Sequence, residues 1–255
     1  MFFEMQQEEI RRLLKMRRRG MYVYALPNLF TSANLLFGFL AIIAAAEAHF
    51  EKSAWAIVLA AVCDLLDGRV ARLTQTTSKF GIEYDSLCDL VSFGLAPAIT
   101  IYYASLIAFE RVGLGVAILF AICGALRLAR FNVFAAAQPK SYFEGLPIPS
   151  ASLCIATLIF FSRELQVSLS GNVTVLILTA ALALLMVSTI RFPSFKDTHF
   201  RHGRPLGLLA IVLTIFILLV AWFEISAFLL LLTYIISSVL TDLIRQIRKP
   251  KKLPV

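Results

Sequence analysis

Long apolar stretches alternate with short polar ones along most of the chain. An α-helix needs about 20 apolar residues to cross a lipid bilayer, and most of the apolar stretches approach or exceed that length. The pattern predicts an all-α polytopic membrane protein with about eight transmembrane helices. The expected ranges are 26–46, 53–73, 85–108, 112–132, 146–162, 172–191, 206–223 and 225–242. The fifth is short, and only the three residues 222–224 separate the last two.

The first twenty residues, MFFEMQQEEIRRLLKMRRRG, have a different pattern. Ile10, Leu13 and Leu14 share one side of a helix, and arginines beside them can reach lipid headgroups, which is typical of an amphipathic surface helix. We therefore expect an amphipathic juxtamembrane segment (1–20), a single transmembrane catalytic domain (21–242) and a basic cytoplasmic tail (243–255). A cleaved signal peptide is the alternative, but the first apolar run is too long for one.

Charge distribution sets the expected orientation. Hydrophobic residues make up 59% of the 255 positions and charged residues 16%, whereas soluble domains average about 25% charged. The net charge is +8, but its distribution argues against nucleic acid as a partner. If the N-terminus is cytoplasmic, the inner segments hold 21 of the 24 lysines and arginines and the outer loops hold 3. This bias predicts a cell membrane protein with both termini cytoplasmic and with basic residues facing anionic lipids.

Four aspartates interrupt the apolar pattern in the stretch CDLLDGRVARLTQTTSKFGIEYDSLCD, residues 63–89. A carboxylate within a membrane costs on the order of 3 kcal/mol, so it usually marks a functional site. Helical periodicity places these aspartates on two stripes, one on each of two antiparallel neighbouring helices, which can face each other across one cavity. The stripe positions are Asp64, Asp67, Gly68, Ala71 and Arg72 on the second helix and Gly81, Asp85 and Asp89 on the third.

Four converging carboxylates repel one another, and Arg72 supplies only one positive charge. Divalent cations would supply the rest, and an all-oxygen ligand set favours Mg²⁺, Mn²⁺ or Ca²⁺. The small residues of the two stripes leave room beside the metal for a bulky group. Metals that bridge phosphoryl oxygens are a recurrent means of phosphoryl transfer. The stripes therefore predict a metal site, near the cytoplasmic side, that takes a phosphate-bearing substrate.

The spacing D-x2-D-G-x2-A-R-x8-G-x3-D-x3-D resembles the signature of the CDP-alcohol phosphotransferases at every fixed position. The resemblance implies transfer of a phosphatidyl or similar group from a CDP-linked donor to an alcohol, with release of CMP. It implies two metal ions, with Asp89 contacting the second ion and acting as the general base. It also implies a homodimer. The metal ligands would be Asp64, Asp67, Asp85 and Asp89.

The resemblance also implies that CDP binds at Gly68, Arg72 and Gly81. Asn28 and Thr31 share a face of the first helix with Asn34, and we assign the first two to the same nucleotide site. Hydrogen bonding between helices is the alternative role for this polar face.

Three further stretches resemble the phosphatidylserine synthase branch of the family: LPNLFTSANLLFGFLAI (26–42), RLARFN (127–132) with GLPIPSA (145–151), and STIRFPSFK (188–196). They imply CDP-diacylglycerol as the donor and L-serine as the acceptor. The carboxylate of serine needs a cation, preferably arginine. The candidates are Arg127, Arg130, Arg191 and Lys196. The first two are favoured because they begin inside the apolar segment, and they could instead bind the phosphates of the donor. The alternative for each is an ordinary basic residue that anchors a helix end at the inner membrane surface.

Two other functions stay open. The same chemistry with glycerol 3-phosphate or inositol phosphate as the acceptor would also use basic residues. A cation-coupled transporter is a different class of protein. Transporters bind their ions near the middle of the membrane and often break helices there, whereas these carboxylates gather toward one side.

Overall fold

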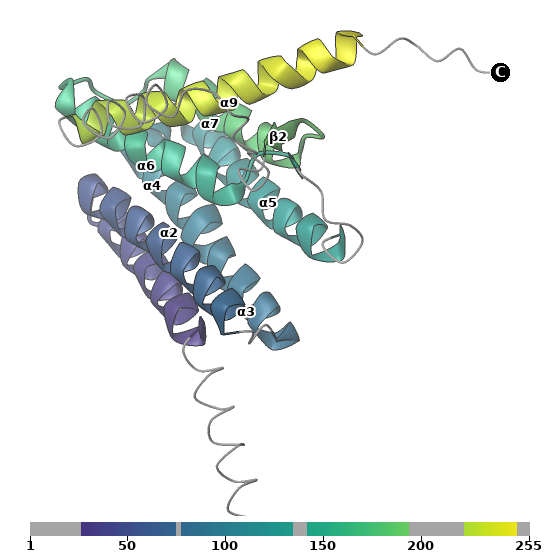
Figure 1. The fold of residues 1–255 in the computed structure, drawn as a ribbon. Coiled ribbons are helices and arrows are strands. Elements are labelled where there is room, and N and C mark those ends of the chain that lie inside the picture. Colours follow the sequence, from purple (N-terminus) through teal and green to yellow (C-terminus); the bar gives the residue numbers. More distant parts are fainter. Residues whose placement is uncertain (1–26, 75–77, 135–141, 194–221, 249–255) are drawn as a thin grey trace, which may run out of the picture.

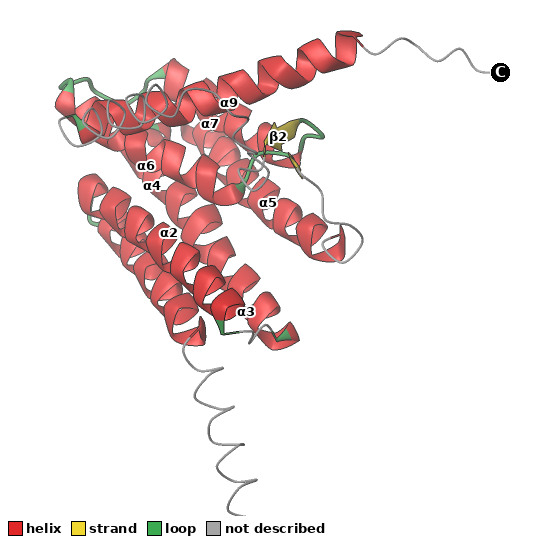
Figure 2. Ribbon diagram, in the orientation of Figure 1, coloured by secondary structure: helices red, strands yellow, loops and turns green. Residues whose placement is uncertain are grey.

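The computed structural model describes residues 27–74, 78–134, 142–193 and 222–248. Most of these residues are helical, and the helices pack into one bundle (Figures 1 and 2). The helices are Pro27–Ala46, α2 (Phe50–Leu73), α3 (Lys79–Asp89), η1 (Leu90–Leu95), α4 (Ala96–Ala104), η2 (Leu106–Phe109), α5 (Glu110–Phe134), α6 (Ile148–Glu164), α7 (Val173–Val187) and α9 (Phe223–Arg248). Two short antiparallel strands, β1 (Tyr142–Glu144) and β2 (Arg191–Pro193), form the one sheet of the described residues.

Side chains at the helix starts explain several of these boundaries. The Ser78 hydroxyl accepts a hydrogen bond from the backbone N–H of Gly81 at 2.9 Å, which caps α3. Asn172 caps α7 in the same way, through Thr174 N–H at 2.9 Å. Pro147 directly precedes α6, which has a second proline in its first turn, where a missing N–H costs nothing. The caps fix where the loops of the bundle end.

The rod from Lys79 to Ala104 is continuous but not uniform. Its α-helical part α3 ends at Asp89, and the π-helix η1 follows directly before α4 begins at Ala96. Single π-helical turns are rare and frequently occur at functional sites. The π-helix thus lies directly between the carboxylates of α3 and the packing residues of α4.

Small side chains allow the helices to approach closely where they cross. One apolar cluster joins the helix Pro27–Ala46 to α2, α4 and α6. Each of these four helices contributes a fully buried alanine to it: Ala41, Ala54, Ala96 and Ala156. A second, larger apolar cluster joins α4, α5, α6, α7 and α9 around residues such as Phe120. The helix Pro27–Ala46 lies beside α2, and α3 lies near the far end of α2 (Figure 1). This arrangement brings three helix ends together at one end of the bundle.

Among the described residues, four helices are long and apolar enough to cross a membrane. They are Pro27–Ala46, Lys79–Ala104, Leu106–Val133 and Phe223–Arg245. The other long helices fall short for specific reasons: α2 carries charged residues, α6 has 17 residues, and the apolar α7 has 15. The expected helical membrane protein is therefore confirmed, whereas the count of eight spans stays a prediction.

Two differences between the observed helices and the expected ranges concern the ends of α7 and α9, and two expected segments lie outside the described residues. The helix expected at 172–191 ends at Val187, because the chain becomes extended at Ser188 and then enters β2. The last helix starts at Phe223 and continues to Arg248, six residues beyond the expected end at 242. The segments 1–20 and 206–221, for which we expect a surface helix and most of a seventh span, lie outside the described residues.

Candidate metal and nucleotide site

Three of the four aspartates meet between α2 and α3. Asp64 and Asp67 lie one turn apart on α2 and face Asp85 on α3. One carboxylate oxygen from each residue lies within 4.8 Å of the other two. Asp67 is buried and the other two are partly buried, so water screens their mutual repulsion less than it would at the surface. The structure therefore brings the two predicted stripes together, and their charges are left to repel one another.

These charges have no directly compensating lysine or arginine in the part of the chain that the structure describes. Within residues 27–74, 78–134, 142–193 and 222–248, no lysine or arginine forms an ion pair with the cluster. The exposed Arg72 instead donates from Nε to the Gly68 carbonyl of its own helix at 2.8 Å. Asp85 Oδ1 is buried, and no described residue donates a hydrogen bond to it. A carboxylate oxygen in this situation is costly, and a bound divalent cation would remove the cost. The cluster therefore fits a hard divalent metal.

Asp89 lies beside the cluster instead of within it. It ends α3 one turn beyond Asp85, and it is only 8% exposed. Its Oδ1 accepts a hydrogen bond from Asn34 Nδ2 at 2.9 Å. It is close enough to Asp64 and Asp85 to interact with both electrostatically. A buried carboxylate next to a metal-holding group is well placed to exchange a proton with a bound substrate.

The helix Pro27–Ala46 supplies hydrogen bonds to both carboxylate helices. Thr31 Oγ1 donates to Asp67 Oδ2 at 2.9 Å, and Asn34, one turn further on, donates to Asp89. The sequence assigns Thr31 to the nucleotide, whereas the structure shows its hydroxyl on a carboxylate. Asn34 shares the same helix face, and its i, i+3 spacing from Thr31 was the signal for a role at the site.

A cavity of about 180 Å³ opens beside the cluster. Asp67 and Asp85 form part of its wall, and it includes all five residues that the sequence assigns to CDP: Asn28, Thr31, Gly68, Arg72 and Gly81. A Cβ atom added at Gly68 would meet no other atom within 4 Å, so this part of the wall is open. Typical ligand pockets measure about 300–1,000 Å³, so the cavity matches part of a nucleotide rather than the whole.

Among the described basic candidates, Arg127 is the one that is buried. Its side chain is 8% exposed, and it interacts electrostatically with Asp89. Its Nε is buried, and no described residue accepts a hydrogen bond from it. A buried guanidinium N–H without an acceptor is costly, which suits a site that receives an anionic ligand.

Arg130 has a different environment, although it lies only one turn away. Its guanidinium donates to the backbone carbonyls of Glu144 at 2.7 Å, Val187 at 3.0 Å and Ser188 at 3.2 Å. These bonds tie α5 to the C-terminal end of α7, where carbonyls lack helical partners and the helix dipole favours a cation. Arg191 lies in β2, in register with Glu144, and Lys196 lies outside the described residues. The structure therefore gives the three described candidates, Arg127, Arg130 and Arg191, three different environments.

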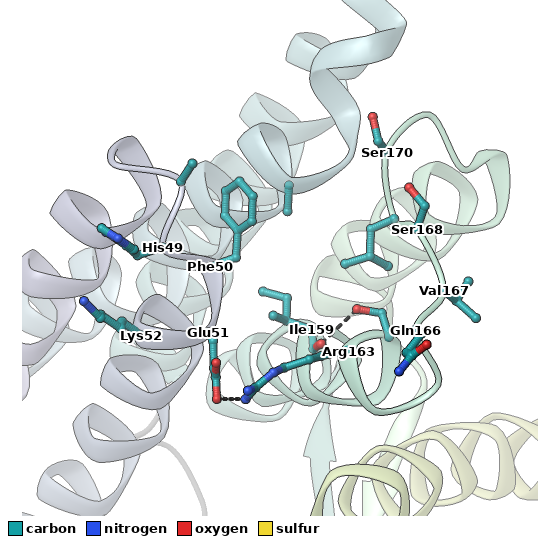
Figure 3. Close-up of a pocket in the computed structure, with 14 residues that line it drawn as sticks. His49, Phe50, Glu51, Lys52, Ile159, Arg163, Gln166, Val167, Ser168 and Ser170 are labelled. Carbon is teal, nitrogen blue, oxygen red and sulfur yellow. Dashed lines mark hydrogen bonds and ion pairs between the residues drawn. The ribbon is translucent and has the colours of Figure 1, made fainter.

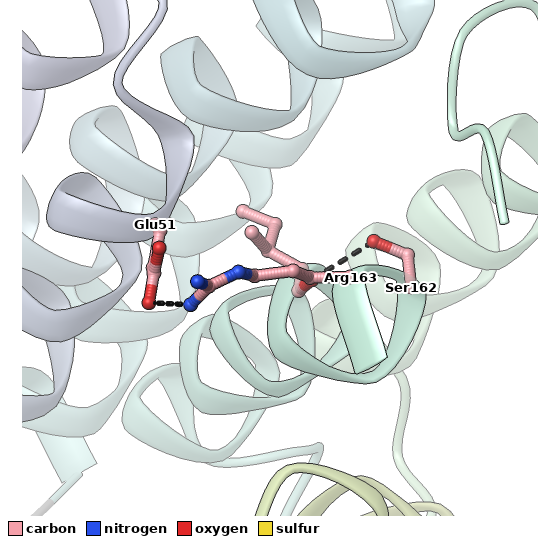
Figure 4. A network of polar contacts seen from close by, with 4 residues as sticks. Glu51, Ser162 and Arg163 are labelled. Carbon is pink, nitrogen blue, oxygen red and sulfur yellow. Dashed lines mark hydrogen bonds and ion pairs between the residues drawn. The ribbon is translucent and has the colours of Figure 1, made fainter. Parts of the chain in front are cut away.

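A larger cavity lies at the opposite end of α2. It measures about 640 Å³ and is formed by the start of α2 together with the loop after α6 (Figure 3). Glu51 and Arg163 form an ion pair in its wall (Figure 4). At 1.5 Å per residue, Glu51 is about 24 Å along α2 from Asp67. None of the described residues that the sequence assigns to the site lines this cavity.

Comparison with known proteins agrees with this geometry. The family model for CDP-alcohol phosphatidyltransferase matches residues 24–189, a range that includes both aspartate helices and Arg127. The chain belongs to this family.

Within this family, the chain is similar to several proteins named for the synthesis of serine lipids. The chain is 43% identical over 176 residues to a CDP-diacylglycerol–serine O-phosphatidyltransferase of Helicobacter pylori (strain ATCC 700392 / 26695), covering 68% of this chain and 74% of the relative. A protein of the same name from Bacillus subtilis (strain 168) is 34% identical over 171 residues, covering 67% and 91%. An archaetidylserine synthase of Methanothermobacter thermautotrophicus is 37% identical over 171 residues, covering 66% and 70%.

Proposed function

We propose that the protein transfers a phosphatidyl group from CDP-diacylglycerol to L-serine, giving phosphatidylserine and CMP. The observation that carries the proposal is the meeting of Asp64, Asp67 and Asp85, with carboxylate oxygens within 4.8 Å of one another beside a cavity. This cluster supports metal-assisted transfer of a phosphate-linked group. The names of the relatives, two of them serine phosphatidyltransferases, support serine as the acceptor.

The clustered carboxylates would hold Mg²⁺ or Mn²⁺, with Ca²⁺ as a further hard ion that suits oxygen ligands. We propose two ions, with Asp89 contacting the second. When bound, the metal supplies positive charge to the diphosphate oxygens and to the departing CMP. The buried Asp85 Oδ1, which lacks a donor among the described residues, supports this assignment.

CDP would bind in the cavity next to the cluster. The open wall at Gly68 would let the diphosphate approach the backbone of α2, because no Cβ stands in the way. The exposed Arg72 would contact a phosphate oxygen. Asn28 and Gly81 line the other side. For Thr31, whose hydroxyl lies on Asp67, we propose that it also orients this carboxylate.

The serine hydroxyl would lose its proton to Asp89 as its oxygen forms a bond to the phosphatidyl phosphorus. The bond between that phosphorus and the CMP oxygen breaks, and CMP leaves with the electron pair. Arg127 would bind the serine carboxylate, since its Nε is buried without an acceptor among the described residues and it lies in the field of Asp89. This would hold the amino acid with its hydroxyl near the base.

The membrane arrangement is part of the same proposal. The placement of 21 of the 24 lysines and arginines in the inner segments supports cytoplasmic termini and contacts with anionic lipids at the cell membrane. The aspartates would then open toward the cytoplasm, from which serine enters, while the acyl chains of the donor stay in the bilayer. We also propose eight spans and a homodimer, which the family resemblance implies.

An acceptor assay tests the proposed function. Purified protein in vesicles receives CDP-diacylglycerol, Mn²⁺ and one labelled acceptor at a time: L-serine, glycerol 3-phosphate or inositol phosphate. We expect labelled phosphatidylserine and an equal amount of CMP with serine alone. Lipid labelled from glycerol 3-phosphate but not from serine would overturn the assignment. Cation flux into the vesicles without CMP release would support a transporter instead.

A further inference from the structure

A single side-chain hydrogen bond links the first described helix to Asp89. Asn34 is fully buried in the middle of Pro27–Ala46, and its Nδ2 donates to Asp89 Oδ1 at 2.9 Å. An ionised carboxylate can accept hydrogen bonds but cannot donate them. The NH₂ end of the Asn34 amide must therefore be the end that faces Asp89. The Asn34 donor therefore restrains the orientation of the Asp89 carboxylate.

The π-helix that follows Asp89 fixes the backbone of Asn34 in turn. Ser92 Oγ, in η1, donates to the Asn34 carbonyl at 2.9 Å. One turn further along, Gly38 packs directly on Ser92, and a Cβ atom added at Gly38 would collide with Ser92 backbone and side-chain atoms. Two further contacts, both at Ser92, thus hold the two segments together about one turn beyond the contact between Asn34 and Asp89.

A buried polar pair far from the carboxylates, Ser53 and Thr100, differs from Asn34 in how its hydrogen bonds are satisfied. Ser53 and Thr100 are fully buried and share a hydrogen bond of 2.7 Å between α2 and α4, and Thr100 Oγ1 is also 2.6 Å from the Ala96 carbonyl. Asn34 Oδ1, by contrast, is buried, and no described residue donates to it. Leaving a buried carbonyl unpaired costs about 1–3 kcal/mol, a cost typically tolerated where function requires it.

We propose that Asn34 is a positioning residue for the transfer reaction. By holding Asp89 Oδ1, its amide directs Asp89 Oδ2 to the hydroxyl of the acceptor. This inference rests on the proposed function, because it takes Asp89 as the base. A misplacement of about 1 Å at a reacting group can reduce a rate about 100-fold, so loss of this restraint should appear in kcat.

The test compares Asn34→Ala with the control Ser53→Ala, which removes a buried interhelical hydrogen bond far from the carboxylates. For Asn34→Ala we expect kcat to fall about 100-fold, while KM for CDP-diacylglycerol stays within about threefold. The affinity for the Mn²⁺ ion held by Asp64, Asp67 and Asp85, read by electron paramagnetic resonance, should also stay within about threefold, because Asn34 donates to Asp89 and not to these three carboxylates. Ser53→Ala should lower the thermal midpoint and leave kcat within about twofold.

Asn34→Asp adds a sharper variant. It keeps the shape of the side chain but turns an oxygen toward Asp89, so kcat should fall further than in Asn34→Ala. If Asn34→Ala does not fold, Ser92→Ala takes its place. It frees the Asn34 backbone without touching Asp89 and should lower kcat about fivefold at unchanged KM for the donor.

The inference is overturned if Asn34→Ala or its substitute Ser92→Ala retains the kcat of the unsubstituted protein. It is also overturned if Ser53→Ala loses as much kcat as these variants at an equal drop in thermal midpoint. Failure of the proposed function looks different, because the unsubstituted protein would then form no phosphatidylserine from serine.

Discussion

The two ends of α2 carry acidic residues in opposite electrostatic situations. Near its start, the partly exposed Glu51 forms an ion pair with Arg163 beside the larger cavity. Near its end, Asp64 and Asp67 meet Asp85 beside a smaller cavity, with no ion pair in the described part of the chain. The first end is compensated by the protein itself, and the second requires a charge from outside. Uncompensated buried charge, and not the size of a cavity, therefore identifies the site.

The largest effect should come from removing one carboxylate of the cluster. Asp85→Asn keeps the size of the side chain but removes a charge that would hold the metal. Since metal stabilisation of a transition state amounts to several kcal/mol, we expect kcat to fall about 1,000-fold or more, measured as CMP release. Glu51→Gln is the control from the other end of α2. Exposed ion pairs contribute at most about 1 kcal/mol, so activity should change less than about twofold. Asp85→Asn with a tenth of normal activity would contradict this contrast.

The next largest effect should distinguish the roles of two arginines that lie one turn apart, Arg127 and Arg130. Hydrogen bonds to charged groups contribute about 1.5–3 kcal/mol, so Arg127→Met should raise KM for serine about 30-fold and leave KM for CDP-diacylglycerol nearly unchanged. Arg130→Met should instead lower the thermal midpoint, because it removes three bonds to backbone carbonyls. Steady-state kinetics with each substrate varied, together with thermal unfolding in detergent, measure both. The reverse pattern would show that Arg130 binds the acceptor.

We expect the smallest effect from substituting alanine for one of two glycines that have open surroundings. A Cβ atom added at Gly68 or at Gly115 meets no other atom within 4 Å, so alanine fits at both helical positions. Each substitution should stabilise its helix by about 0.5–1 kcal/mol. Only Gly68→Ala fills the cavity beside the carboxylates, and we expect it to raise KM for CDP-diacylglycerol about tenfold. Equal KM values for the two variants would show that the donor does not approach Gly68.

The helices and the positions of the four aspartates on them could be predicted from the sequence, because both depend on local periodicity. The i, i+3 and i, i+4 spacings of Asp64, Asp67, Asp85 and Asp89 fix the faces of two helices, and the short connection makes these helices neighbours. Among the described residues, apolar runs predicted the helix ends to within about six residues, and the early end of α7 at Val187 is one of the differences. That end depends on Ser188 leaving helical geometry and on the strand pairing of Arg191 with Glu144, which no local pattern announces.

The sequence did not reveal which side chains contact residues far away in the chain. Arg127 and Arg130 look alike in the sequence, yet only the fold shows that Arg130 is engaged by carbonyls of β1 and α7. The hydroxyl of Thr31 was likewise expected at the nucleotide, and its contact with Asp67 depends on how the first helix packs. Such roles depend on contacts between residues that are 14 to 58 positions apart in the chain.

The most direct test of the central claim is a Mn²⁺ titration of the purified protein, followed by electron paramagnetic resonance. If Asp64, Asp67 and Asp85 jointly hold a divalent ion, Asp64→Asn should weaken Mn²⁺ binding about 100-fold, and Glu51→Gln should leave it unchanged. Equal Mn²⁺ affinity in the unsubstituted protein and in Asp64→Asn would contradict the claim.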